Sequence, residues 1–551
     1  MWNQLPEKQK QKYRHLILGY ASLTPAFAQK NDDERTLTPV INSKFQETSF
    51  KDAFFATIED IGNTSYDASV RTDINGKEKK FLVGIKTFGY SSNDQKVAQY
   101  KANLPEWSDL ISTITKNGKE CRTVEEINRV NHDLYEKLAL KICTLRNRKI
   151  ESSKANLRGF QLKSNDDIES VYHVLMPYVN CEDIPTIVVG EISYDEIDTD
   201  HLSVIGCTNK KNPANFRFTD GKHEYKFTAA DSQLYMNFMN SKISQDEWSV
   251  KYLENADQVF IKIAEVLYDG KSNDLTASEL VPDNFFSDTV SEDVKEATPK
   301  ITESYSWLLT DKNGNVPRYS GFNSFYGLGS KTPQEARKQR ALNLRKKYSE
   351  TCSSVSLETL VNSLVEYIDN PAKTNSEKPD KEIERDKIMY YTQSLNNEEL
   401  INEVRKILYR PQQEVYIPIP DAKTFHAEHP YFFGDRLAEL KENGKSLAKE
   451  LPKDRSFDLV FEPSGQKMRA FIAEDTGKSI ESVDSQAVMG KWLIEGVFQL
   501  EPYKPLTVQR LNELEINAIR LYKMENSDDV HLKFIWIDEE NIPDDFIGRK
   551  K

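Results

Sequence analysis

Three side chains between positions 50 and 89 have the types and spacing of a hydrolytic site: Glu59, Asp67 and Lys86. Carboxylate oxygens are the ligands that Mg²⁺ and Mn²⁺ prefer, and an ammonium group beside them can orient water or stabilise negative charge on a phosphate. We therefore expect Glu59 and Asp67 to bind the ion, and all three residues to take part in hydrolysis of a phosphodiester bond.

The secondary structure expected around these residues brings them to one end of a hairpin. Apolar residues recur at helical spacing in FKDAFFATIEDIG, which predicts an amphipathic helix that ends near Gly62 and holds Glu59 off its apolar stripe. Alternation in YDASVR predicts a strand that begins near Asp67, and KKFLVGIKTFG predicts the returning strand, which carries Lys86. The dipeptide Asn75-Gly76 between them is a strong hairpin signal.

This pattern resembles the PD-(D/E)XK nuclease fold of Type II restriction endonucleases, whose motif is an Asp on one strand and (D/E)-x-K on the next. Asp67 and Lys86 match the Asp and Lys of the motif, and Glu59 matches the acidic residue often found on the preceding helix. The resemblance implies Mg²⁺-dependent cleavage of DNA, with Mn²⁺ as a substitute. Gly84 stands where the family usually has Asp or Glu, so the second carboxylate must be absent or come from elsewhere. The candidates are Asp94 and Gln95, expected on the following helix, and Glu191 on the strand TIVVGEISY.

Composition narrows the class of protein. With 551 residues, 38% of them hydrophobic and 29% charged, the chain is typical of a globular protein with two or three domains. Its five cysteines have no CxxC spacing, so neither a disulfide framework nor a zinc site is expected. The sequence lacks a signal peptide and any apolar run of about 20 residues, so we expect a cytoplasmic protein with no membrane partner. The net charge of -13 is compatible with a single basic groove that binds DNA.

The chain is expected to hold two domains. We predict an α/β nuclease domain, with a mixed sheet flanked by helices, over residues 1–369, a linker over 370–387, and a mainly β domain over 388–551. The linker prediction rests on NPAKTNSEKPDKEIERDK, which combines Pro, Ser, Asn and charge with few apolar residues. After it, NEELINEVRKILY predicts a helix, and short β-like runs follow. Before it, TPQEARKQRALNLRKKY predicts a basic helix that suits either a phosphate backbone or a solvated face.

The second domain has motifs of its own between residues 416 and 523: YIPIP, FDLVFEPSGQKMRAFIAEDTGKSI, SQAVMGKWL and PLTVQRLNELEINAIRLYK. Together they resemble the DNA-binding pseudobarrel shared by plant auxin-response-type transcription factors and restriction enzymes of the BfiI and NgoFVII family. In that family two loop arms grip the major groove, so the resemblance implies DNA contacts from DAKTFHAEH and from residues 476–491. Lys and Gln are side-chain types that read guanine and adenine. The residues expected to contact DNA are Lys423, His426, Lys478, Ser479, Gln486 and Lys491.

The two resemblances predict a Type II restriction endonuclease that makes sequence-specific double-strand breaks. Its expected partners are double-stranded DNA, a second copy of the chain in a homodimer, and a separate cognate DNA methyltransferase, since the sequence has no NPPY or DPPY motif. Two alternatives stay open. One is a modification-dependent nuclease that reads methylcytosine, and the other is a non-catalytic DNA-binding regulator in which Gly84 marks an inactive nuclease.

Overall fold

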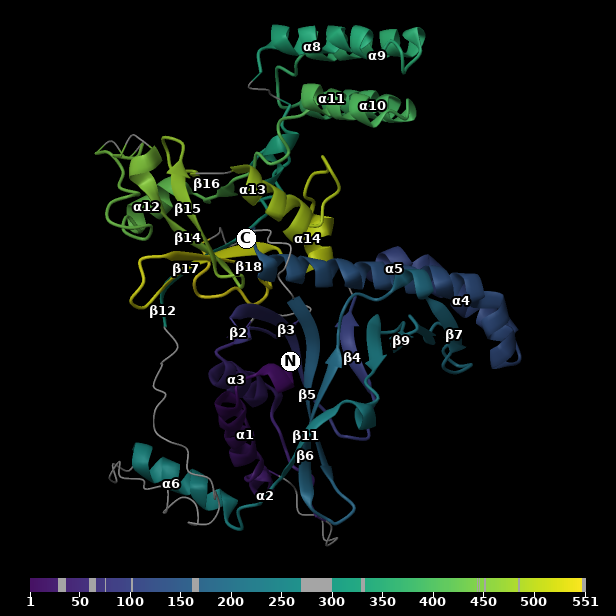
Figure 1. The fold of residues 1–551 in the computed structure, drawn as a ribbon, viewed down its shortest axis with the longest axis vertical. Helices are drawn as coiled ribbons and strands as arrows, with labels where there is room; N and C mark the ends of the chain where they lie inside the picture. Colours follow the sequence, from purple (N-terminus) through teal and green to yellow (C-terminus); the bar gives the residue numbers. More distant parts are fainter. Residues whose placement is uncertain are drawn as a thin grey trace. The chain divides into compact units, whose positions relative to one another are not determined.

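In the computed structural model, the chain divides into two compact units: Met1–Arg158 with Lys163–Lys300, and Gly159–Leu162 with Ile301–Lys551. The structure describes residues 1–27, 36–58, 66–74, 76–100, 103–160, 168–268, 300–328, 332–442, 444, 446–449, 452–483 and 486–547. Each unit combines helices with strands, so the expected α/β class is confirmed at this coarse level (Figure 1).

A mixed sheet forms the centre of the first unit. In the described ranges its strand order is β1-β2-β3-β5-β6-β11, and its strands are β1 (Thr57–Ile58), β2 (Ala68–Ile74), β3 (Lys77–Thr87), β5 (Ile168–Val179), β6 (Pro185–Ser193) and β11 (Ser244–Ser249). β3 and β5 pair in parallel, and the other neighbours pair antiparallel. The pairing of β2 with β3 confirms the predicted hairpin.

Helices cover both faces of this sheet (Figure 1). On one face α1 (Glu7–Ala21) and α3 (Ser43–Phe54) pack over strand residues such as Phe81 and Val83. On the other face α5 (Val124–Arg158) contacts β3 and β5 and forms part of the connection that two parallel strands require. β5 is buried along most of its length, as expected for a near-continuous apolar run in a strand that is covered on both faces.

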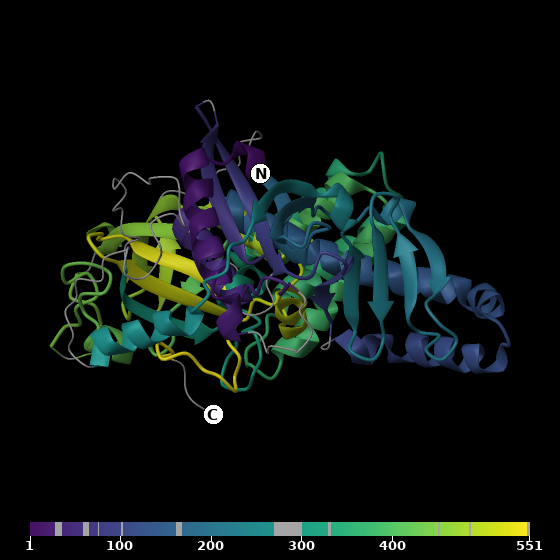
Figure 2. The same cartoon turned by 90° about the horizontal axis from the view of Figure 1, so that it is seen from below.

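The first unit also holds an antiparallel sheet, ordered β4-β10-β9-β8-β7 in the described ranges. Its strands are β4 (Asp94–Gln99), β7 (Ser203–Cys207), β8 (Phe216–Thr219), β9 (Glu224–Thr228) and β10 (Gln233–Asn237). α5 contacts β7 of this sheet as well as strands of the first sheet. α4 (Leu104–Glu120) packs along α5 (Figure 2). The other helices in the described residues of the unit are η1 (Trp2–Gln4), α2 (Thr24–Phe27), η3 (Thr199–His201), η4 (Asn240–Lys242) and α6 (Ala256–Tyr268). No helix in the described part of the chain is long and apolar enough to cross a bilayer.

The second unit is built on a sheet ordered β12-β17-β18-β14-β15-β16-β13 over its described residues. These strands are β12 (Ile301–Leu308), β13 (Ile417–Pro418), β14 (Ser456–Glu462), β15 (Gln466–Ala473), β16 (Ser479–Ser482), β17 (Ala518–Met524) and β18 (Val530–Ile535). Each of them contributes to one apolar core, in which Trp307, Leu459 and Leu521 are buried. Helical segments close the same core: η5 (Gly321–Tyr326), α12 (Ala422–Glu428), α13 (Gln486–Lys491), the π-helical η7 (Trp492–Val497) and α14 (Val508–Leu514). The short helix η6 (Pro452–Arg455) directly precedes β14.

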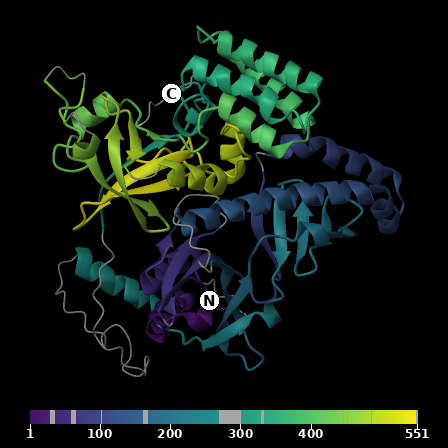
Figure 3. The same cartoon turned by 45° about the horizontal axis from the view of Figure 1, so that its top comes forward.

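A bundle of helices is inserted in this unit between β12 and β13 (Figure 3). It consists of α8 (Gln334–Lys347), α9 (Ser354–Asp369), α10 (Lys378–Ser394) and α11 (Glu398–Leu408), which share a separate apolar core. α8 and α11 confirm the two helices predicted here. Much of the basic character of α8 is used inside the bundle, in the ion pairs Lys338–Asp369, Arg345–Glu358 and Lys347–Glu403.

The division of the chain into compact units differs in position from the predicted domain boundary. Residues 370–387 were expected to link a domain over 1–369 to one over 388–551, but α10 begins at Lys378, and the compact units meet at Lys300 and Ile301. Pro379 gives the segment the look of a linker, but it stands in the first turn of α10, where its missing N–H is tolerated. The charged residues Lys381, Glu382 and Arg385 are buried in α10, where Glu382 pairs with Arg318 and Arg385 donates to the Tyr326 carbonyl. Ile388 and Met389 anchor the helix in the bundle core.

We predict that a fragment of residues 301–551 unfolds cooperatively in urea and that a fragment of residues 388–551 does not. The shorter fragment lacks β12, η5 and most of the bundle, and with them the buried side chains of Trp307 and Phe322. The test compares far-ultraviolet circular dichroism with tryptophan fluorescence, which should report the same midpoint only for a two-state domain. Both fragments lack Phe160, which packs on Phe461 and Trp492, so that loss is matched. A sharp coincident transition in the shorter fragment would restore the boundary near residue 388.

Candidate functional site

Asp67 and Lys86 come together across the β2–β3 hairpin. Asp67 precedes β2, donates its backbone N–H to the Val83 carbonyl at 2.9 Å, and accepts the Ile85 N–H through Oδ2 at 2.6 Å. Lys86 lies near the end of β3, with its Nζ 5.4 Å from the centre of the Tyr172 ring. The hairpin register and the backbone hydrogen bonds therefore fix the carboxylate beside the lysine, as the sequence predicts.

The pKa values of Asp67 and Lys86 are shifted in opposite directions. Burial raises the pKa of Asp67, against the lowering effect of Lys86 and of the Ile85 N–H. Burial also lowers the pKa of Lys86, and Arg146 and Lys96 push it further down, while Asp67 opposes the shift. A carboxyl with a raised pKa beside an amine with a lowered pKa is an arrangement in which a proton passes at low cost between groups that are usually far apart in acidity.

Gly84, at the position of the missing carboxylate, faces an aromatic ring. It lies opposite Tyr172 in the parallel β3–β5 register, and a Cβ built on Gly84 would stand 2.4 Å from two ring carbons of Tyr172. Behind the ring, Arg146 of α5 donates to the Tyr172 hydroxyl at 3.4 Å and is itself buried. Any side chain at position 84 would have to displace this packed ring, so glycine is a packing requirement here.

Sequence reasoning missed a second acidic residue near the pair. Glu47 of α3 lies near enough to raise the pKa of Asp67 and to oppose the lowering of the pKa of Lys86, and its own carboxylate pairs with Lys44 at 2.8 Å. The signal that would have placed Glu47 on the helix before the hairpin is Asn42, which caps α3 by accepting the Phe45 N–H.

The helix that was expected to carry Glu59 ends earlier than predicted. α3 stops at Phe54, and Phe55 follows in the left-handed conformation with φ 52°, which ends a helix even without glycine. The predicted extension to Gly62 is therefore wrong at residues 55–58. Glu59 itself lies outside the described residues.

The three candidates for the missing carboxylate are engaged elsewhere. Asp94 and Gln95 lie on strand β4, not on the expected helix. Asp94 pairs with Arg217 at 2.6 Å and with Lys226 at 2.8 Å. Glu191 accepts the backbone N–H of Trp2 with both carboxylate oxygens, at 2.9 and 2.8 Å, and Gln95 donates to the Ser92 carbonyl. Asp94, Gln95 and Glu191 are therefore each engaged in a contact away from the Asp67–Lys86 pair.

The described donor set for a divalent ion is small. Within the described ranges no three acidic, histidine or cysteine side chains gather in one group. Mg²⁺ is commonly held by one or two carboxylates, with water and substrate phosphate completing its shell. Asp67, with one oxygen not used by Ile85, and Glu47 nearby suit such a substrate-completed site and not a preformed cage.

The six residues expected to contact DNA in the second unit divide into two groups. Lys423 and Lys478 are exposed and line one pocket of about 540 Å³, together with Thr476 and Tyr416. Lys491 is exposed at the end of α13, and the side chain of Gln486 lies outside the described part. His426 and Ser479 are at most 1% exposed, which does not suit a contact with DNA in this conformation.

His426 and Ser479 have structural positions. The His426 Nε2 lies 2.9 Å from the Gly477 carbonyl oxygen, and burial lowers the pKa of the imidazole. Ser479 stands on β16 between β13 and β15. The described residues of the run 476–491 form a turn, the strand β16 and the helix α13, and the contact of His426 with Gly477 holds the turn against α12.

Comparison with known proteins adds no family to this description. No protein-family model matches the chain, and no curated protein is significantly similar to it.

We predict that Gly84→Ala lowers the free energy of unfolding by about 1–3 kcal/mol, because the added methyl group overpacks the Tyr172 ring. Urea denaturation measures the difference. Gly89→Ala is the matched control, since nothing lies within 4 Å of a Cβ at that position. Equal losses of stability in the two variants would contradict the packing argument.

We also predict that Asp67→Asn lowers the pKa of Lys86 further. The substitution removes the carboxylate that favours the ammonium form, and leaves burial, Arg146 and Lys96 to favour the neutral amine. Carbon-13 NMR of reductively dimethylated lysines, followed through a pH titration, measures the shift. Asp73→Asn, on the same strand, should leave the Lys86 resonance unchanged. A Lys86 pKa that stays fixed in Asp67→Asn would show that the two charges do not interact.

Proposed function

We propose that this chain is a Mg²⁺-dependent endonuclease that cuts duplex DNA in the manner of a Type II restriction enzyme. The observation that carries the proposal is the half-buried Asp67–Lys86 pair, aligned by the β2–β3 hairpin next to a parallel strand. A carboxylate and a lysine with opposed pKa shifts are more typical of a reacting centre than of a structural ion pair, which would be closer and satisfied by hydrogen bonds.

The proposed roles follow from the chemistry of each side chain. Lys86, whose ammonium form is destabilised, would accept or orient a proton of the attacking water and then stabilise the extra negative charge on the phosphate. Asp67, fixed by the Ile85 N–H, would hold its free oxygen toward the same point. Glu47 would take the part expected of an acid on the preceding helix.

A divalent ion would be held by Asp67 and Glu47, with Mn²⁺ as a substitute for Mg²⁺. When bound, such an ion polarises the scissile phosphate and lowers the pKa of a coordinated water. Tyr172, packed over Gly84, excludes a further carboxylate from this point. Substrate phosphate would therefore supply more of the ligands of the divalent ion than it does in nuclease sites that have two carboxylates on their strands.

Recognition of the target sequence is proposed for the second unit. Lys423 and Lys478 come from two separate arms and line the same pocket, so they are suited to contact adjacent phosphates or base edges. The pocket also contains Asp421 and Glu474, which would disfavour indiscriminate binding to a polyanion. The proposed partners remain duplex DNA, a second copy of the chain in a homodimer, and a separate methyltransferase, with the cytoplasm as the proposed location.

A second candidate function is DNA binding without cleavage. The specific observation in its favour is that Tyr172 fills the space of the second strand carboxylate. The chain would then be a DNA-binding regulator without cleavage activity, with a nuclease-like sheet in its first unit and a DNA-binding domain like that of a restriction enzyme in its second.

We predict that the full chain cleaves plasmid DNA in Mg²⁺ or Mn²⁺ and not in EDTA. Asp67→Asn and Lys86→Ala should each reduce the single-turnover rate of cleavage by about 100-fold or more, while the dissociation constant for DNA changes little. Gel electrophoresis measures cleavage, and fluorescence anisotropy measures binding. Methylated and unmethylated plasmid should be tested side by side, since cleavage of the methylated form alone would establish the modification-dependent alternative.

Controls separate the nuclease from the regulator. Asp73→Asn, a carboxylate change further along β2, should leave cleavage intact. Lys423→Ala combined with Lys478→Ala should weaken DNA binding and flatten its salt dependence, while Lys346→Ala on α8 should do neither. Binding of DNA without cleavage in any metal would support the regulator, and cleavage by both site variants at the wild-type rate would overturn the assignment of Asp67 and Lys86.

A further inference from the structure

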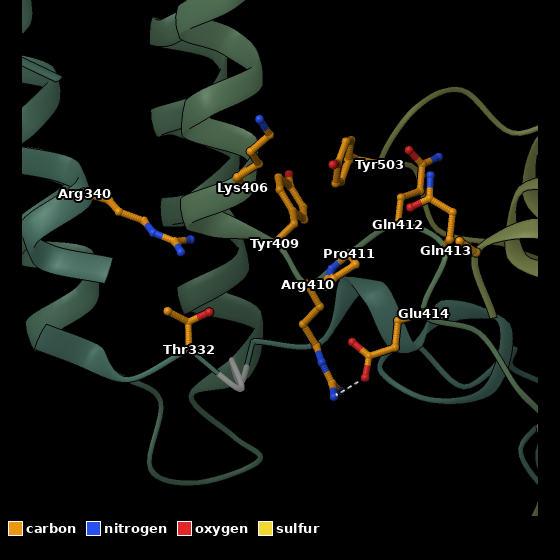
Figure 4. Close-up of a pocket in the computed structure, with 11 residues that line it drawn as sticks. Thr332, Arg340, Lys406, Tyr409, Arg410, Pro411, Gln412, Gln413, Glu414 and Tyr503 are labelled. Atoms are coloured by element: carbon orange, nitrogen blue, oxygen red, sulfur yellow. Dashed lines mark hydrogen bonds and ion pairs between the residues drawn. The ribbon is translucent and has the colours of Figure 1, made fainter. Parts of the chain in front are cut away.

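A second pocket of the C-terminal unit has a lining suited to a specific small ligand. It occupies about 590 Å³ beside the helical bundle, where α13 and the segment before α14 complete its lining, and this volume is within the usual range for small-molecule sites. α8 and α11 supply one side, and the segment that leads from α11 to β13 supplies another (Figure 4). The lining residues are Thr332, Arg340, Lys406, Tyr409, Arg410, Pro411, Gln412, Gln413, Glu414, Ala487 and Tyr503.

An unsatisfied amide lies in the wall of this pocket. Gln412 is only 6% exposed, and its Nε2 has no hydrogen-bond partner in the described part of the chain. A buried donor without a partner is uncommon, because desolvation of the group is left uncompensated. Gln413 lines the pocket next to it, so two primary amides are available to a ligand that offers acceptors and donors in one plane.

Cations supply the second feature. Arg340 is exposed on α8 and points toward the α11 side of the pocket, and Lys406 extends from α11 (Figure 4). Arg410 is different, because it turns to Glu414 and pairs with it at 2.8 Å. Glu414 is thus largely neutralised. Lys406 also has an acidic partner, Glu403 on the same helix at 3.4 Å, but its side chain is exposed, so Arg340 is the main pocket cation for an anionic ligand and Lys406 is the second.

Aromatic faces supply the third feature. Tyr409 and Tyr503 lie in contact, with ring centroids 5.0 Å apart and planes inclined by 46°. Behind Tyr409, the buried Arg385 stands 4.4 Å from the ring centre and donates to the Tyr326 carbonyl at 2.9 Å. Tyr409 is therefore held from behind, and the pair offers a rigid surface on which a flat ring can stack.

We propose that this pocket binds a nucleoside phosphate. The base would stack on the Tyr409–Tyr503 wall and receive hydrogen bonds from Gln412 and Gln413, and the phosphate would contact Arg340 and Lys406. A simple anion would leave the amides and rings unused. The ligand is either a free nucleotide or one nucleotide of a nucleic acid strand, since both present the same chemistry. This inference does not depend on the nuclease proposal, because no residue of the Asp67–Lys86 pair takes part.

Isothermal titration of the full chain tests the proposal. The titrants are the four deoxynucleoside 5′-monophosphates, the matching nucleosides, inorganic phosphate, and a short single-stranded oligonucleotide. A monophosphate that binds more tightly than both its nucleoside and inorganic phosphate is expected for a free nucleotide. Binding of the oligonucleotide alone, sensitive to the same substitutions, identifies a nucleotide within a strand.

Three variants make the test specific. Arg340→Ala should weaken binding by about tenfold or more, through loss of a charge-assisted contact, and Lys346→Ala on the same helix should not. Gln412→Met should weaken binding and at the same time leave the melting temperature of the free protein equal or higher, because it removes an unpaired buried donor. A lower melting temperature with unchanged affinity would instead show that Gln412 has a structural role and overturn its place in the site.

The outcomes also separate this proposal from the nuclease. Asp67→Asn should bind the nucleotide or oligonucleotide with wild-type affinity at this pocket, whatever its effect on cleavage. Inorganic phosphate that binds as tightly as any nucleotide would reduce the pocket to an anion site and overturn the proposal. Affinity for nucleotide and oligonucleotide that is unaffected by Arg340→Ala would overturn it as well.

Discussion

The parallel pairing of β3 with β5 is the constraint on which the candidate active site depends. It sets Gly84 opposite Tyr172 and Lys86 opposite Val174, so the ring occupies the space beside the lysine. Parallel strands also need a long connection, and here part of that connection is α5, which brings Arg146 behind the ring. The absence of a carboxylate at position 84 and the lowered pKa of Lys86 therefore share one origin in the packing of two neighbouring strands.

The sequence predicts those features of the fold that depend on local pattern. The β2–β3 hairpin, α8 and α11 follow from alternation, a turn dipeptide and helical periodicity, and the structure has all three. The pair Asp67 and Lys86 follows with the hairpin, because strand register alone brings them together. The end of α3 does not follow, since Phe55 adopts a left-handed conformation that its type does not signal. The predicted helix begins at Phe50, whereas α3 begins at Ser43, so the prediction does not include Glu47.

Long-range packing accounts for the other differences. The segment 370–387 has a linker's composition, and only the bundle formed with α8, α9 and α11 makes part of it a helix. The burial of His426 likewise depends on Gly477, 51 residues further along the chain. Conversely, the basic run of α8 suits a phosphate backbone when only the sequence is considered. In the structure, several of its charges are neutralised by acidic residues of the bundle.

The insertion of the bundle between β12 and β13 has a consequence for how the second unit is made. Thr302 on β12 contacts Lys523 on β17, 221 residues further along the chain. At a synthesis rate of about 5–20 residues per second, β12 waits roughly 10–45 s on the ribosome before its neighbour exists. The bundle, whose contacts are closer in sequence, can form during that interval, whereas Trp307 and the open edge of β12 stay exposed. Newly made chains should therefore depend on chaperones to protect this strand until translation is complete.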